Sequence, residues 1–247
     1  MNDDVYGIKK WGNDILEILE NGNIGLKNPF HPDNSPADLI KIIKSLNERG
    51  ISCPVLLRVT DYLAFRIKQI NNSFFRAIRE IRYKGEYKGV FPVKVNQQAQ
   101  VIDRIVEFGK EFDFGLEVGS KPELLIALAH DLSANSTIIC NGIKDREFIH
   151  LAILSIKIGF KTILVLESPR ELDLIIKISK ELNVRPLLGI RVKLTNKVSG
   201  NWSQSSGDRS AFGLSVEQVM EVINKLKIYD YLDCLILQHS HLGSQIP

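Results

Sequence analysis

The chain has 247 residues, of which 44% are hydrophobic and 25% charged, and a net charge of +3 at pH 7. These values are ordinary for a globular protein that is long enough to bury a sizeable core. The net charge is small and no Lys/Arg block is present, which argues against nucleic acid or a membrane surface as a partner. No apolar run is long enough to span a membrane. Three widely spaced cysteines, Cys53, Cys140 and Cys234, and an acidic N-terminus unlike a signal peptide fit a reducing cytoplasm.

The first 50 residues are predicted to contribute to a β-rich region. Asn21-Gly22 lies between the apolar runs 15–19 and 24–26, a pattern typical of a β-hairpin. Ser35-Pro36-Ala-Asp38 predicts the start of a helix that has one apolar face and ends at Gly50. We therefore expect an N-terminal segment that differs from the rest of the chain.

From about residue 51 the chain alternates strand-like and helix-like segments. The strand-like segments are short apolar runs, typical of strands buried on both faces of a parallel sheet. They cover residues 53–59, 89–95, 114–118, 137–140, 162–166, 187–192 and 234–239. Three of the helices are predicted to begin with a capping box, at Ser120, Ser168 and Ser215. This repeat predicts an α/β fold, either a doubly wound sheet or a (β/α)8 barrel.

The predicted domains are the N-terminal segment, residues 1–50, and an α/β body, residues 51–247. Seven strands are counted, whereas a closed (β/α)8 barrel has eight. Since Pro247 comes just after the seventh, we expect either an open sheet or a barrel truncated before its last strand. The polar loop 195–209 follows a strand and is a candidate lid over a site.

Lys94 stands near the end of an apolar run, Gly89-Val-Phe-Pro-Val-Lys-Val-Asn-Gln97. In a strand, Lys94 would share one face with Pro92 and Asn96, while the other face would be purely apolar. A lysine in apolar surroundings can be kept partly unprotonated, as formation of a Schiff base requires. The simpler alternative is a solvated lysine at a strand end.

Polar side chains stand at the C-terminal ends of most predicted strands, the place where β/α barrels build their active sites. The set comprises Lys94, Asn96, Glu117, Asn141, Glu167, Arg191, Lys193, His239, His241 and Ser244. Each of them alone has a structural explanation, such as an ion pair or a buried histidine with its hydrogen bonds satisfied. Together they indicate an enzyme.

The first candidate chemistry uses an aldehyde cofactor. Lys94 would form the Schiff base, and His241 would stack on the cofactor ring. Arg191 would lie near the phenolate oxygen of the ring, and Glu117 would help to orient the ring or a group beside it. Ser244 would donate a hydrogen bond to a phosphate.

Two alternatives stay open on the residues alone. His239 and His241 could bind a metal on one strand face, with Lys94 or Glu117 as a further ligand, as in metal-dependent amidohydrolase barrels. The third possibility is a barrel-type sensor or binding domain for a small molecule, without catalysis.

Several stretches resemble the biosynthetic arginine decarboxylases, pyridoxal-phosphate enzymes of the alanine-racemase-like barrel class. They are Val90-Phe-Pro-Val-Lys-Val-Asn-Gln, Gly115-Leu-Glu-Val-Gly-Ser-Lys-Pro-Glu-Leu, Ile139-Cys-Asn-Gly-Ile-Lys-Asp-Arg-Glu and His239-Ser-His-Leu-Gly-Ser-Gln, together with Tyr6-Gly-Ile-Lys-Lys-Trp-Gly-Asn and Ser210-Ala-Phe-Gly-Leu. The resemblance runs through almost the whole chain. The motifs around Lys94 and His241 are shared with ornithine and diaminopimelate decarboxylases, so a related amino acid (ornithine, lysine or diaminopimelate) is the alternative substrate.

The resemblance implies an incomplete (β/α)8 barrel that binds pyridoxal 5'-phosphate. Lys94 would be the Schiff-base lysine, and His241 and Glu117 would complete the catalytic set. Arg191, His241 and Ser244 would contact the ring oxygen, the ring face and the phosphate. The implied reaction converts L-arginine to agmatine and carbon dioxide in cytoplasmic polyamine (spermidine and putrescine) synthesis. Magnesium and a homo-oligomer are implied as well.

Members of this family continue far beyond the point that corresponds to Pro247. The further part carries the closing strand, a Gly-rich phosphate loop and a catalytic cysteine given across a dimer. None of Cys53, Cys140 and Cys234 lies in a matching context. We therefore expect the N-terminal portion of such an enzyme, with negligible activity by itself.

Overall fold

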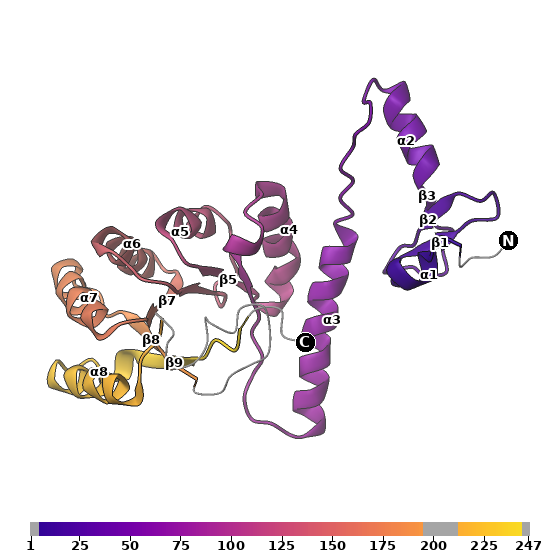
Figure 1. The fold of residues 1–247 in the computed structure, drawn as a ribbon. Helices are drawn as coiled ribbons and strands as arrows, with labels where there is room; N and C mark the ends of the chain where they lie inside the picture. The colour runs from indigo at the N-terminus through magenta and orange to yellow at the C-terminus, as the bar shows by residue number, and fades with distance from the viewer. Residues whose placement is uncertain (1–4, 195–211, 244–247) are drawn as a thin grey trace. The chain divides into compact units, whose positions relative to one another are not determined.

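The computed structural model describes residues 5–194 and 212–243. The chain separates into two compact units, Met1–Glu80 and Ile81–Pro247, and Figure 1 draws the elements of both. Among the described residues, no helix is both long and apolar enough to cross a membrane. The domain boundary predicted at residue 50 stays a prediction, and the candidate lid, residues 195–209, lies outside the described residues.

The first unit contains a small antiparallel sheet with strand order β1-β2-β3. Its elements are α1 (Ile8–Trp11), β1 (Leu16–Ile18), β2 (Ile24–Leu26), β3 (Ala37–Asp38), α2 (Leu39–Glu48) and α3 (Asp61–Glu80). The predicted hairpin is confirmed, and its turn contains Gly22 at a φ of 80°. Helix α2 begins later than predicted, because Asp38 rather than Ser35 caps it by accepting from the N–H groups of Ile40 and Lys41.

The strand predicted over residues 53–59 is wrong, since this stretch forms neither helix nor strand. Its apolar side chains are exposed rather than packed in a core, as Val55, Leu56 and Leu57 show. A strand needs a neighbouring strand for its backbone N–H and C=O groups. Residues 53–59 have no such neighbour among the described residues, so their apolar run does not form a strand.

The second unit is built on a parallel sheet of six strands. The strands are β4 (Val90–Pro92), β5 (Gly115–Val118), β6 (Thr137–Cys140), β7 (Lys161–Leu166), β8 (Leu187–Arg191) and β9 (Leu235–His239). They lie side by side in chain order, so the sheet never reverses its winding. That order is the one found in β/α barrels, whereas a doubly wound sheet reverses at a switch point.

Helices alternate with the strands and follow one face of the sheet (Figure 1). They are α4 (Ala99–Gly109), α5 (Lys121–Leu128), α6 (Arg146–Lys157), α7 (Pro169–Leu182) and α8 (Val216–Ile228), with 3-10 turns η1 (Val93–Val95), η2 (Lys110–Phe112) and η4 (Leu232–Cys234). The sheet is open within the described residues, with β4 and β9 as its edges. The predicted incomplete barrel of the alanine-racemase-like type is confirmed, and its parallel sheet has six strands among the described residues in place of the seven counted.

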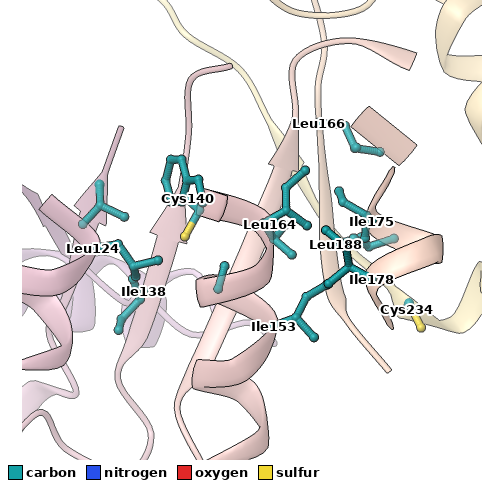
Figure 2. Close-up of a cluster of buried hydrophobic side chains, with 14 of the residues drawn as sticks. Leu124, Ile138, Cys140, Ile153, Leu164, Leu166, Ile175, Ile178, Leu188 and Cys234 are labelled. Carbon is teal, nitrogen blue, oxygen red and sulfur yellow. The ribbon is translucent and has the colours of Figure 1, made fainter. Parts of the chain in front are cut away.

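The main core lies between the sheet and its helices (Figure 2). Strand residues such as Ile138, Cys140 and Leu164 pack there against helix residues such as Ile153 and Ile178. Burial raises the pKa of the Cys140 thiol to about 12, so this cysteine behaves as a small core side chain, as predicted.

The opposite face of the sheet carries a second, smaller apolar cluster. Ile139, Ile163 and Val165 form it, and they alternate along β6 and β7 with residues of the main core. We call this the inner face, because in a β/α barrel the face away from the helices lines the interior. The inner strands β5 to β8 are therefore buried on both faces, as their unbroken apolar runs predicted, whereas the edge strands β4 and β9 are only partly buried.

The predicted capping boxes are confirmed only in part. At Ser215 both hydrogen bonds of the box form with Gln218. At Ser120 and Ser168 the serine caps its helix, but the glutamate three residues on accepts from the N–H one residue before the cap. Glu171 thus accepts a hydrogen bond from the backbone N–H of Glu167.

Candidate active site

Side-chain alternation places five polar residues on the inner face, at the C-terminal ends of consecutive strands. In β5, Leu116 and Val118 pack in the main core, so Glu117 between them faces inward. The same alternation puts Asn141, Glu167, Arg191 and His239 on the inner face, after or at the ends of β6, β7, β8 and β9. Since parallel strands end at one edge of the sheet, these groups gather there, as the sequence predicted.

Lys94 lies in the 3-10 turn η1 directly after β4, not in the strand itself. The predicted alternation therefore ends at Pro92: Val93 is buried in the main core, while Val95 is exposed. Of the two alternatives for Lys94, the structure agrees with the solvated lysine and not with the lysine in apolar surroundings. Its side chain is 58% exposed, and its Nζ lies 3.4 Å from Oε1 of Glu117.

Glu117 is the buried partner in this contact, with a side chain that is 8% exposed. Its Oε1 also accepts a hydrogen bond from Nδ2 of Asn141 at 3.0 Å. Its Oε2 and the Oδ1 of Asn141 are buried without a hydrogen-bond partner. The side chain of Asn96 has a local structural contact instead. Its Oδ1 accepts a hydrogen bond from the backbone N–H of Gln98, at the start of α4.

Arg191 and Glu167 form a buried ion pair beside this group. Nη1 of Arg191 lies 3.1 Å from Oε1 of Glu167, and the two side chains are 13% and 0% exposed. The guanidinium also lies over the ring of Phe212, 5.4 Å from its centroid. Gly213 allows this approach: its φ is 86°, and a Cβ there would lie 3.2 Å from Cγ of Arg191.

His239 pairs with Arg191 across β8 and β9, and His241 follows two residues later. Burial lowers the pKa of His241, and the positive charges of Arg191 and Lys94 lower it further. Burial and Arg191 also lower the pKa of His239, whose Nδ1 is buried without a partner. The carboxylates of Glu117 and Glu167 act in the opposite direction on the pKa of His241 and raise it.

These shifts predict a pH dependence of stability. The unfolded chain takes up protons near the ordinary histidine pKa of 6.5, whereas folded His239 and His241 do so only at lower pH. The free energy of unfolding should therefore fall as the pH drops from 6.5 through the folded pKa values. Urea unfolding measured from pH 7.5 downward checks this. The double variant His239→Gln/His241→Gln should lose less stability over the same range, and an unchanged pH dependence would contradict the assignment.

The structure brings together Lys94, Glu117, Arg191 and His241, four of the five predicted site residues. Ser244 lies outside the described residues. Two contributors were not predicted, Lys144 and Glu171, which lie buried behind Glu167. The only signal for Glu171 was its place in a capping motif, and Lys144 sits in a polar Gly-Ile-Lys-Asp loop that looks solvated.

The metal-binding alternative finds no ligand set. Among the described residues, no group of three or more His, Cys, Asp and Glu side chains could hold a metal ion. His239 and His241 therefore lack the further ligands that an amidohydrolase-type centre needs in this part of the chain.

Comparison with known proteins identifies a family. Residues 67–247 match the model described as pyridoxal-dependent decarboxylase, pyridoxal binding domain. Proteins named biosynthetic arginine decarboxylase from Gloeobacter violaceus and Prochlorococcus marinus are each 46% identical to this chain over 98% of it. The chain spans 38% and 37% of the lengths of these two relatives.

Solved structures agree on the fold. The biosynthetic arginine decarboxylase from Campylobacter jejuni superposes with a TM-score of 0.84 at 34% identity, covering 98% of this chain and 37% of that one. A diaminopimelate decarboxylase from M. jannaschii, at a TM-score of 0.68 and 23% identity over 95% of this chain and 49% of that one, shares the fold. Because the family model covers well over half of its residues, this chain belongs to the pyridoxal-dependent decarboxylase family and contains that family's pyridoxal-binding domain.

Proposed function

We propose that this chain binds pyridoxal phosphate through Lys94 and is part of an enzyme that decarboxylates L-arginine to agmatine and carbon dioxide in polyamine synthesis. The observation that carries the proposal is the contact of Lys94 with Glu117 at the strand ends, beside the Arg191–Glu167 pair. The names of the arginine decarboxylases to which the chain is similar support the choice of substrate.

The residues at the strand ends fit this cofactor. Oε2 of Glu117, Oδ1 of Asn141 and Nδ1 of His239 are buried without hydrogen-bond partners. Leaving such atoms unpaired costs free energy, so they are suited to a polar ligand that is still to enter. When bound, pyridoxal phosphate supplies an electron sink for the electron pair that remains after carbon dioxide leaves.

Each residue has a distinct task in the proposal. Lys94 would hold the aldehyde group through its amine, and Glu117, 3.4 Å from that amine, holds the lysine in place. Arg191 would donate to the ring oxygen, and Glu167 fixes the orientation of the Arg191 guanidinium. His241 would cover the ring face. Ser244 binding the phosphate stays a prediction.

Borohydride reduction tests the attachment. The chain incubated with pyridoxal phosphate and reduced should carry the label on Lys94, as mapped by mass spectrometry of its peptides. Lys94→Met should abolish the label. Lys88→Met is the matched control, because Lys88 pairs with Asp113 away from the site and its loss should leave the label in place. A label elsewhere, or none, would overturn the proposal.

The same trapping reaction ranks the substrates. A substrate amine that competes with Lys94 for the aldehyde group would lower the yield of label. We expect L-arginine to protect Lys94 at lower concentration than ornithine, lysine or diaminopimelate. Protection that is strongest with one of the other three would move the assignment to that substrate. Magnesium and a homo-oligomer, which the resemblance implied, stay predictions.

A further inference from the structure

A second buried ion pair lies behind the site. The side chain of Lys144, in the loop between β6 and α6, is 0% exposed. Its Nζ donates to the carbonyl oxygens of Gly142 and Val165, each at 2.5 Å, and lies 3.3 Å from Oε1 of Glu171. The three N–H donors of this ammonium group thus have three acceptors. Lysine is rarely buried completely, so this arrangement calls for an explanation.

Glu171 connects this lysine to the loop after β7. Its Oε1 accepts from the backbone N–H of Lys144 at 2.8 Å. Its Oε2 accepts from the backbone N–H of Glu167, also at 2.8 Å. A single buried carboxylate therefore ties the loop after β6 to the residue that binds Arg191.

Lys144 holds Glu167 from the other side. Gly142, whose carbonyl accepts from Lys144, donates its N–H to Oε1 of Glu167 at 3.0 Å. Glu171 thus fixes the backbone of Glu167, and Gly142, whose carbonyl Lys144 binds, fixes the carboxylate of Glu167. Two cations and two carboxylates make the whole set electrically neutral, which limits the cost of burying it.

We propose that Lys144 and Glu171 are positioning residues, which hold Glu167 and, through it, set the place of the Arg191 guanidinium at the site. Both residues act on Arg191 through Glu167 and Gly142. This proposal depends on the proposed function in one respect only, the expectation that a misplaced Arg191 weakens the binding of pyridoxal phosphate.

The decisive variant replaces the whole pair, Lys144→Met/Glu171→Leu. Removing one partner alone leaves a buried, unpaired charge and risks unfolding, whereas apolar replacement of both partners of a buried ion pair is often tolerated. The double variant keeps Glu167 and Arg191 but removes the acceptor of the Glu167 N–H. Ile178→Val, in the main core on α7, is the control for a general loss of stability.

The first readout needs no cofactor. Phenylglyoxal modifies accessible arginine side chains, and mass spectrometry follows the rate of modification at Arg191. Arg185 serves as the internal reference, because it pairs with Asp233 away from the site. The ratio of the rate at Arg191 to the rate at Arg185 should be about tenfold higher in the double variant. A factor of about ten corresponds to the loss of one hydrogen bond to a charged group, here the bond from the Glu167 N–H to Glu171. Ile178→Val should leave this ratio unchanged.

The second readout is the affinity for pyridoxal phosphate, measured from the concentration that half-labels Lys94 after reduction. It should fall by about tenfold in the double variant, on the same scale of one lost charged hydrogen bond. An unchanged Arg191 rate in the folded double variant overturns the proposal, because the pair would then serve stability alone. If the unaltered chain is never labelled at Lys94, the proposed function fails, while the Arg191 rate still decides the positioning role.

Discussion

Replacing Glu167 by glutamine should lower the free energy of unfolding of the second unit by about 3 kcal/mol, the typical cost of breaking a buried ion pair. Glutamine keeps the size of the side chain and an oxygen for the N–H of Gly142. It leaves the Arg191 guanidinium, whose side chain is only 13% exposed, without its carboxylate. Urea unfolding followed by circular dichroism measures the difference.

Glu147→Gln is the matched control for this prediction. Glu147 pairs with Lys121 at 2.6 Å, but its side chain is 80% exposed, so solvent screens the interaction. The control should change the free energy of unfolding by no more than about 0.5 kcal/mol. Equal effects of the two substitutions would show that the Arg191–Glu167 pair contributes no more than a surface pair.

Leu164→Ala should have an effect of similar size for a different reason. Leu164 is fully buried in the main core, where it packs with Ile153 and Ile178 (Figure 2). Truncation removes buried methyl groups and leaves a cavity, so the free energy of unfolding should fall by about 3 kcal/mol.

Leu125→Ala provides the comparison for Leu164. Leu125 lies on α5 and is 56% exposed, so the same chemical change removes little buried surface. Its effect should stay below about 1 kcal/mol in the same denaturation experiment. A loss at Leu125 as large as that at Leu164 would mean that the exposed face of α5 is covered in solution.

The parallel sheet could be predicted because its strands carry unbroken apolar runs between capped helices. Residues 137–140 coincide with β6, and the predicted starts of α5, α7 and α8 agree with their caps at Ser120, Ser168 and Ser215. Residues 53–59 show the limit of the same reasoning. Apolar composition indicates burial against something, but a strand also needs a partner strand, which composition does not reveal.

The site was predictable to the extent that strand ends converge. Glu117 and Arg191 were placed correctly because their neighbours in the strand are apolar on the other face. The local structure at Lys94 was not, since β4 is only three residues long and turns into η1 before the lysine. Lys144 could not be found, because its full burial depends on the Val165 carbonyl and the Glu171 carboxylate, which are far away in the sequence.

Each strand has an outer face, which packs on the helices, and an inner face, which carries the site. This arrangement has a consequence for evolution. Substitutions at Asn141 or His239, which have unused hydrogen-bonding atoms, can alter recognition while the packed outer face stays as it is. Glu167 lacks this freedom, because it joins the site to the loops behind it. Laboratory selection for a new substrate should therefore accumulate changes at the first two positions and retain the third.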